Sequence, residues 1–387
     1  MGVANRRLRA EIYQRIADVP GQIWDDLITG SHETLSRTFW SVLEASGLND
    51  FEYRYVLFFD EQGQAAGLSS FYNVTTDIAI FATGVLRTLL NGMRRVFPNF
   101  LKLRMLECGT PITITSPPFV RRDDIEDADI VAALHEVLMR VARQEGQLFI
   151  VARDFEPESF ALETEFRRHG YHWIGSLPNT YIENVWKNPD DYLGAMRSYF
   201  RSKLKKHLRR NVEAGVTHRL VEDFDELATI LHQQWMLVHE NAKEFQREVL
   251  TPEFYRHYAR MMGSRSKALL FYRHGELAGH ALLMVDGDML RWLYVGRDVA
   301  ANDNLYLYIA QKVVETAIQL GVRRLEMGLT TYPIKQDLGA VVTPIRVAVR
   351  ARWGLINPFV GLGYNLLNEV PAPAPRDIFK AAGSKAA

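Results

Sequence analysis

Three side chains capable of acid–base or electrostatic chemistry stand close together near the end of the chain. Glu326 lies in the middle of the run at 322–329 that is typical of a buried strand, and Tyr332 and Lys335 follow it before Gly339. A strand-borne carboxylate is a candidate general base, and a tyrosine hydroxyl can protonate a leaving group. A lysine ammonium can bind phosphate or stabilise an oxyanion. The alternatives are an exposed or arginine-paired Glu326, a packed Tyr332 and a solvated Lys335.

A predicted strand–helix–strand unit positions these residues. Apolar runs at 290–295 and 322–329 read as strands, and residues 304–320 have helical periodicity with Gly321 as the stop. A helical crossover makes the two strands parallel, so ligands are expected at their carboxyl ends, near the helix N-terminus. The polar and aromatic residues predicted there are Tyr294, Arg297, Asn302 and Asn304. Tyr294 could orient a substrate, or it could simply pack in the core.

A basic helix is predicted at 192–214. Its cations recur at steps of four residues and therefore share one face; they are Arg197, Arg201, Lys205 and Arg209. No acidic residue stands between Arg197 and Arg210. This face is a candidate phosphate-binding surface, and a solvated helix face is the alternative.

Composition limits the possible classes of protein. The 387 residues exceed one usual core, so two domains are expected. Acidic and basic residues number 46 each, so electrostatic recognition must be local. A single Cys108 excludes an intrachain disulfide and fits a reducing compartment. Without a signal peptide, a long apolar run or metal-ligand spacing, the sequence predicts a cytoplasmic protein with no metal and no membrane partner.

The two halves of the chain repeat one order of elements. Hairpins at 54–72 and 268–285 are each followed by a strand, a helix and another strand. We therefore expect an α+β fold made by a diverged duplication, with a mixed sheet flanked by helices in each half. The predicted domains are 1–187 and 188–370, and the Pro/Ala-rich residues 371–387 are predicted to be disordered. A chain ending at Pro375 is accordingly expected to keep its stability.

This order resembles the GNAT-type N-acetyltransferase fold, present twice. The second half resembles the bacterial FemAB-like group, through the basic helix at 202–211, Tyr294-Val295-Gly296 and Asn304-Leu305. The clearest mark is the stretch at 332–339, which is similar to the Phe-Lys-x-x-Phe-Gly type of signature. The resemblance implies that Lys335 lies near the site of transfer. The first half resembles the family only in the order of its elements.

One departure from the family concerns the donor. Acetyltransferases of this superfamily usually hold the coenzyme A pyrophosphate in a glycine-rich loop, whereas residues 297–302 keep the arginine and have no glycine. The resemblance implies an enzyme that transfers an acyl group from acyl-CoA to an amine of a small-molecule acceptor, with Arg297, Asn302 and Asn304 at the donor. Some FemAB-like proteins take an aminoacyl group from tRNA instead. A binding protein that has lost catalysis is the competing class.

Overall fold

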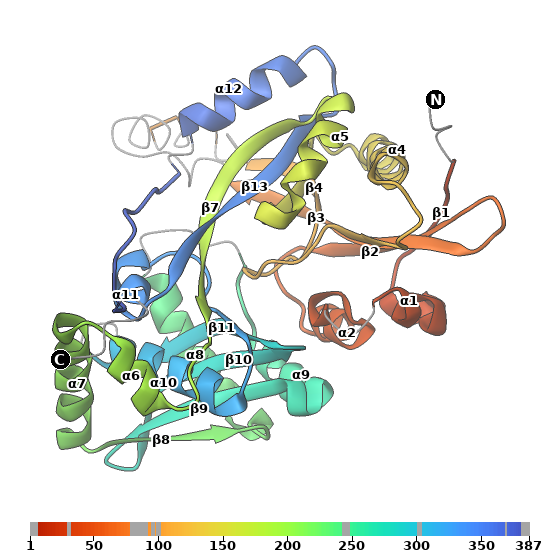
Figure 1. Ribbon diagram of the computed structural model, residues 1–387. Coiled ribbons are helices and arrows are strands. Elements are labelled where there is room, and N and C mark those ends of the chain that lie inside the picture. Colours follow the sequence, from red (N-terminus) through yellow and green to blue (C-terminus); the bar gives the residue numbers. More distant parts are fainter. Residues whose placement is uncertain are drawn as a thin grey trace. The chain divides into compact units, whose positions relative to one another are not determined.

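The computed structural model describes residues 7–28, 32–77, 92–93, 97, 102–241, 248–299, 304–367 and 370–380. The chain forms two compact units, coloured along the sequence in Figure 1. Unit 1 comprises Met1–Leu177, Arg247–Val249 and Pro344–Pro371, and unit 2 comprises Pro178–Gln246, Leu250–Thr343 and Ala372–Ala387. The expected boundary after residue 187 lies too late, because it was placed where an extended segment ends and a helix begins. The chain passes between the units ten residues earlier, inside the continuous strand β7 (His172–Glu183).

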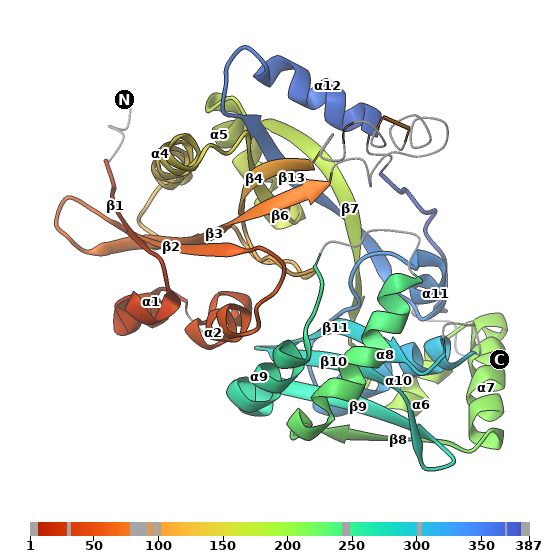
Figure 2. The same ribbon diagram turned by 180° about the vertical axis from the view of Figure 1, so that it is seen from behind.

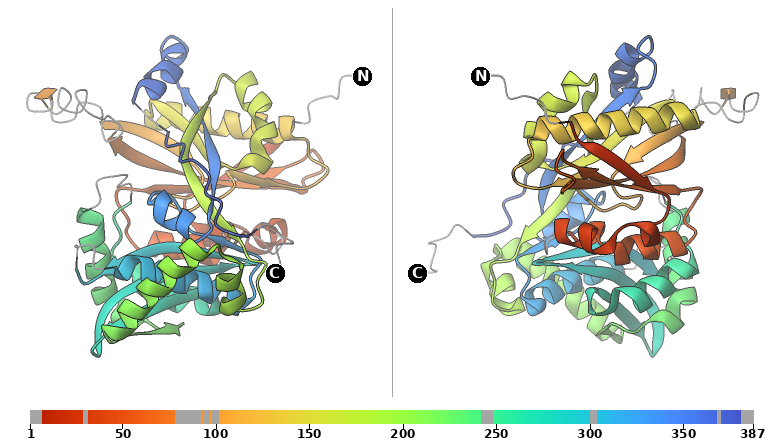
Figure 3. Two further views of the ribbon diagram at one scale, coloured as in Figure 1. Left: turned by 60° about the vertical axis from the view of Figure 1, so that its left-hand side comes forward. Right: turned by 90° about the vertical axis from the view of Figure 1, so that its right-hand side faces the viewer.

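Unit 1 is a mixed sheet with helices on both faces. Its strand order is β1-β2-β3-β4-β6-β13-β7, with β5 paired to β3. The strands besides β7 are β1 Arg9–Tyr13, β2 Glu52–Phe59, β3 Ala65–Asp77, β4 Lys102–Cys108, β5 Phe119–Arg121, β6 Phe149–Phe155 and β13 Val341–Ala351. The helices are α1 Gly21–Leu27, α2 Arg37–Ala45, α4 Asp127–Glu145, α5 Glu163–Arg168 and α12 Asn357–Leu367. Figure 3 shows α1 and α2 on one face of the sheet and α4 on the other.

Unit 2 repeats this architecture. Its strand order is β7-β12-β11-β10-β9-β8. The strands besides β7 are β8 Val216–Val221, β9 Ser266–Arg273, β10 Glu276–Asp286, β11 Met289–Arg297 and β12 Arg324–Glu326. The helices are α6 Pro189–Ala195, α7 Ser198–Glu213, α8 Ala228–Glu240, α9 Pro252–Met262, α10 Leu305–Leu320 and α11 Tyr332–Asp337. Figures 1 and 2, from opposite sides, show α6, α7 and α10 over one face and α8 and α9 over the other.

The expected duplication is visible in matching details of the two units. Hairpins β2–β3 and β9–β10 are antiparallel, and each has a register shift next to its turn. A Cβ on Gly67 or on Gly279 would lie 2.6 Å or 2.9 Å from a backbone oxygen, so both positions need glycine for close approach of a neighbouring chain segment. A parallel strand pair follows in each unit, β4–β6 and β11–β12. The expected α+β fold with two tandem domains is confirmed.

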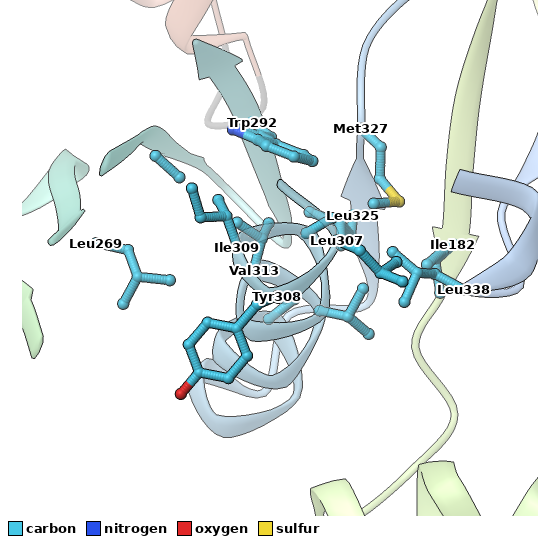
Figure 4. Close-up of a cluster of buried hydrophobic side chains, with 14 of the residues drawn as sticks. Ile182, Leu269, Trp292, Leu307, Tyr308, Ile309, Val313, Leu325, Met327 and Leu338 are labelled. Atoms are coloured by element: carbon cyan, nitrogen blue, oxygen red, sulfur yellow. The ribbon is translucent and has the colours of Figure 1, made fainter. Parts of the chain in front are cut away.

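The central strand–helix–strand unit also has the predicted parallel topology. β11 and β12 pair in parallel and α10 connects them, ending at Gly321 in the left-handed conformation with φ of 68°. The helix buries one long apolar face against the sheet in a single cluster, part of which Figure 4 shows. Two details differ from expectation. β12 already ends at Glu326, and the segment that contains Lys335 is the short helix α11.

The stretch predicted to be a disordered tail is partly ordered. Ile378 is buried, and the ring of Phe379 lies 4.9 Å from that of Trp186. The backbone N–H of Arg197 donates to the Ile378 oxygen at 2.9 Å, and that of Lys380 donates to the Ala195 oxygen at 3.0 Å. The prediction was wrong for residues 374–380, because Pro and Ala disfavour regular structure but do not prevent two following apolar side chains from packing. Residues 381–387 lie outside the described part of the chain.

This packing makes a truncation informative. A chain ending at Pro375 loses the buried Ile378 and the half-buried Phe379, so we expect the free energy of unfolding of unit 2 to fall by roughly 2–5 kcal/mol. A chain ending at Lys380 keeps both residues and is the matched control. Thermal or urea unfolding of the two proteins measures the difference. Equal stability of the two truncated chains would show that the contacts of residues 376–380 contribute nothing.

Candidate active site

A buried ion-pair network lies where β11 and β12 pair. Arg291 and Glu326 are register partners on these parallel strands, and the Arg291 guanidinium donates to Glu326 Oε2. Arg291 Nε also donates to Asp286 Oδ2 at 2.7 Å, and Asn179 Nδ2 donates to Glu326 Oε1 at 2.6 Å. All four side chains are buried. Both oxygens of Glu326 therefore accept hydrogen bonds within the network.

Lys335 adds a second buried cation. Its side chain is only 3% exposed, and Nζ donates to the backbone oxygens of Gly328 at 2.9 Å and Leu329 at 2.5 Å. Burial lowers the pKa of Lys335 from 10.5 to about 7, while the negative charge of Glu326 acts in the opposite direction. An amine with such a pKa can both accept and donate a proton near neutral pH. Lys335 is therefore neither solvated nor in a loop.

The loop that Lys335 binds has a strained backbone. Gly328 has a φ of 75°, and the β-branched residues Thr330 and Thr331 have φ of 59° and 52°. Each such threonine costs on the order of 1–3 kcal/mol, and strain of this kind concentrates at functional sites. The hydroxyl of Thr180 donates to the Gly328 oxygen at 2.6 Å, which is also bound by Lys335. The loop is thus held in its conformation by β7 on one side and by α11 on the other.

The two tyrosines predicted at the site have different surroundings. Tyr332 is buried at the start of α11, and its hydroxyl donates to the Pro178 oxygen at 3.0 Å. Tyr294 is half-buried on β11, with its ring edge-on to those of Trp235 and Phe254 at 6.1 and 5.9 Å. Tyr332 therefore anchors α11, and the ring of Tyr294 is packed among aromatic side chains.

The end of β11 carries the residues predicted for a donor. Pairing with β12 ends at Arg291, but β11 continues to Arg297, with a bulge that leaves Leu293 unmatched between Trp292 and Tyr294. Bulges of this kind are frequent next to active sites. The first turn of α10 holds no acidic residue, and Asn304 stands before it. Asn302 lies outside the described residues.

The positive charge of Arg297 acts on the hydroxyl of Tyr306, which lies in the first turn of α10. Burial raises the pKa of the Tyr306 hydroxyl, and a hydrogen bond with Thr331 and the Arg297 charge act against this rise. The ring of Tyr306 stacks on that of Trp292 at 5.9 Å. Arg297, Tyr306 and the strained loop are therefore neighbours. Arg297, which is predicted to bind the acyl donor, thus lies close to the loop that Lys335 holds.

The predicted basic face is divided by the tertiary structure. Arg197 is the residue before α7, and its guanidinium binds Asp377 and the Phe379 oxygen. Arg201 lies within 3.5 Å of the Gly194 and Met196 oxygens. Lys203 on α7 is half-buried and binds Asp337, whereas four other cations of this helix are exposed: Lys205, Lys206, Arg209 and Arg210. Arg197 has an ion-pair partner, Asp377, that lies 180 residues away in sequence and that the spacing of the helix does not reveal.

Sequence reasoning offered an arginine partner for Glu326 as an alternative but named no member of the network around it. Arg291 had a usable signal, since it is a single charge inside the apolar run at 290–295. Asn179 and Asp286 had none, because sheet pairing alone brings them to the network. Among the described residues, no group of three His, Cys, Asp or Glu could hold a metal ion. No helix in the same ranges is long and apolar enough to cross a bilayer.

One segment of unit 2 is similar to a known domain family. Residues 198–336, which contain β8 to β12, Glu326 and Lys335, match the family model described as an acetyltransferase (GNAT) domain. The match covers less than half of the chain, and over this segment the sequence is similar to GNAT acetyltransferase domains.

Similarity beyond this segment is broad but distant. A Mycobacterium tuberculosis protein named "Putative 8-amino-7-oxononanoate synthase 2" is 29% identical over 322 residues, which are 80% of this chain and 41% of the relative. The chain thus spans less than half the length of this curated relative. Two solved structures share the fold. FemX has a TM-score of 0.53 at 13% identity, covering 87% of this chain and 96% of its own. A tandem GNAT protein from the clavulanic acid biosynthesis pathway has a TM-score of 0.51 at 12% identity, covering 89% and 99%.

The buried amine of Lys335 predicts a pH-dependent stability. Between pH 7 and the ordinary lysine range the unfolded chain binds the proton that the folded chain has lost, so stability should rise with pH. Relative to Lys335→Met, the wild-type protein should gain up to about 1.4 kcal/mol per pH unit between pH 7 and 9. Urea unfolding of both proteins at the two pH values measures the gain. Parallel pH dependences would show that the pKa of Lys335 lies outside this window.

Proposed function

We propose that the chain is an N-acyltransferase that moves an acyl group from acyl-CoA to an amine of a small-molecule acceptor. The observation that carries this proposal is the buried Lys335 amine, which binds the Gly328 and Leu329 oxygens of the strained loop after β12 and feels the charge of Glu326. Both residues lie in the segment that matches the acetyltransferase domain. The fold alone would not distinguish an enzyme from a binding protein, whereas a buried amine with a pKa of about 7 suits proton transfer.

The chemistry requires one proton to be taken and one to be given. The acceptor amine attacks the thioester carbon, and the tetrahedral intermediate carries an oxyanion and an ammonium. Neutral Lys335 accepts a proton from this nitrogen, and the resulting ammonium returns a proton to the leaving thiolate, so that an amide and a free thiol are formed. Glu326 balances the positive charge that Lys335 acquires, and Tyr332 keeps α11 in place.

The donor is assigned to the end of β11 and the start of α10. Arg297 supplies a cation, and the first turn of α10 supplies backbone N–H groups without an acidic side chain to compete for them. Asn302 and Asn304 are the other residues expected at the acyl donor, and Tyr294 is expected to line the site of the acceptor. Cys108 is a free thiol, which is consistent with a reducing compartment such as the cytoplasm.

A direct assay tests the assignment of Lys335. Thiol release from acetyl-CoA and longer acyl-CoAs is followed with a panel of primary amines, and Lys335→Met should lower kcat at least about 100-fold, since proton transfer contributes on this scale. Lys312→Met is the control, because Lys312 lies on α10 and pairs with Glu315. Full activity of a folded Lys335→Met protein would remove Lys335 from the mechanism. A wild-type protein that binds no acyl donor would favour the non-catalytic class.

A second candidate is transfer from aminoacyl-tRNA, which the exposed cations of α7 favour. If Lys205 and Arg209 bind phosphates, replacing both with Ala should reduce the salt dependence of tRNA affinity by roughly 1.5 in the slope of log K against log salt. Filter binding of total tRNA between about 50 and 200 mM salt measures the slope. The double substitution of the exposed Arg15 and Arg167 in unit 1 is the control. Absence of tRNA binding at low salt would exclude this candidate.

A further inference from the structure

The C-terminal segment 374–380 binds α11 through its polar side chains. Gln336 Nε2 donates to the Ala374 oxygen at 2.8 Å. The Arg376 guanidinium donates to the buried carboxylate of Asp337 and to the Pro333 oxygen, the latter at 3.1 Å. Lys203 on α7 donates to the other oxygen of Asp337 at 2.5 Å. The helix that carries Lys335 is thus attached to the end of the chain.

The same segment closes the turn that follows α11. Gly339 has a φ of 93°, and a Cβ there would lie 2.4 Å from the ring of Phe379. Phe379 therefore occupies the space that any other residue at 339 would fill. Its ring also packs against those of Trp186 and Tyr192, and the Tyr192 hydroxyl donates to the Leu338 oxygen at 2.8 Å. Phe379 thus holds the turn that follows α11, and Arg376 holds the helix itself. The strained loop precedes the helix.

We infer that Arg376 and Phe379 are positioning residues for Lys335, so that the C-terminal segment completes the site; the catalytic part of this inference rests on the proposed function. A helix of six residues is too short to be stable without tertiary contacts. Lys335 reaches the Gly328 and Leu329 oxygens only while α11 is seated against the loop. Loosening the segment should let water reach the amine and relax the loop at Thr330 and Thr331.

The effect of burial on the pKa of Lys335 can be separated from the effect of removing a neighbouring charge. Glu326 faces it from β12, and Asp337 lies on its own helix with Lys203 of α7 and Arg376 of the segment as partners. Phe379 carries no charge, so a change at this position alters the amine only through burial. Phe379→Ala is therefore the primary variant, and Arg376→Gln is the second, since its partly exposed side chain can change with less risk to folding.

The test is a titration of the Lys335 amine by NMR. The full-length protein is labelled with ¹³C-lysine, and the Cε signal of Lys335 is assigned by its loss in Lys335→Met. In the wild-type protein the amine should titrate near pH 7, and in Phe379→Ala above pH 8, towards the ordinary value of 10.5. Phe379→Leu, which keeps an apolar side chain, should restore the low value. Phe166→Ala, which removes a buried ring in unit 1, is the control for general loss of stability.

Two outcomes would overturn the inference. One is a Lys335 titration that stays near pH 7 in both Phe379→Ala and Arg376→Gln, and the other is an equal rise in Phe166→Ala. Activity is measured in parallel. The acidic limb of the kcat profile should move to higher pH in Phe379→Ala together with the NMR titration. A changed titration in a protein without acyltransferase activity would refute the proposed function while leaving the positioning role intact.

Discussion

The structure of unit 2 depends on the burial of charge between two parallel strands. Moving an ion pair out of water costs several kcal/mol per ion unless each charge keeps both a counterion and hydrogen bonds. Arg291 meets this condition by binding Glu326 and Asp286, and Glu326 gains a further donor in Asn179. Glu326 also acts on the Lys335 amine, whose pKa is about 7. Removal of Arg291 would take away the guanidinium that binds both carboxylates, so the network constrains β10, β11 and β12 together, and Asn179 joins β7 to it.

This constraint explains why a strained loop can persist after β12. The conformations of Thr330 and Thr331 are unfavourable by themselves, but the Gly328 oxygen is held by Thr180 and by Lys335. The loop therefore connects the ion-pair network to α11, and the contacts of Gln336, Asp337 and Gly339 connect α11 to the C-terminal segment. A shift in any of these elements would be transmitted to the Lys335 amine through direct contacts.

Unit 1 has a comparable polar centre at the matching place. The parallel strands β4 and β6 end beside Glu107 and Arg153, whose charged atoms are 3.9 Å apart, and the Tyr72 hydroxyl donates to Glu107 at 2.8 Å. A buried Arg–Glu pair at a parallel strand end is therefore common to both halves of the duplication. The match to the acetyltransferase domain covers only residues 198–336, within the half that carries Lys335. The shared pair thus belongs to the architecture, and the lysine-bearing helix distinguishes unit 2.

The sequence by itself determined the repeated order of elements and the parallel strand–helix–strand unit that carries Glu326. These follow from local signals, namely apolar periodicity and the glycine at position 321 that ends the helix. Such signals can be read from a short stretch of sequence. Only the tertiary structure decided which groups surround Glu326 and Lys335. Asn179 is 147 residues from Glu326, and Arg376 is 39 residues from Asp337. Burial, ion pairing and the pKa of Lys335 arise from such distant contacts, and local periodicity carries no information about them.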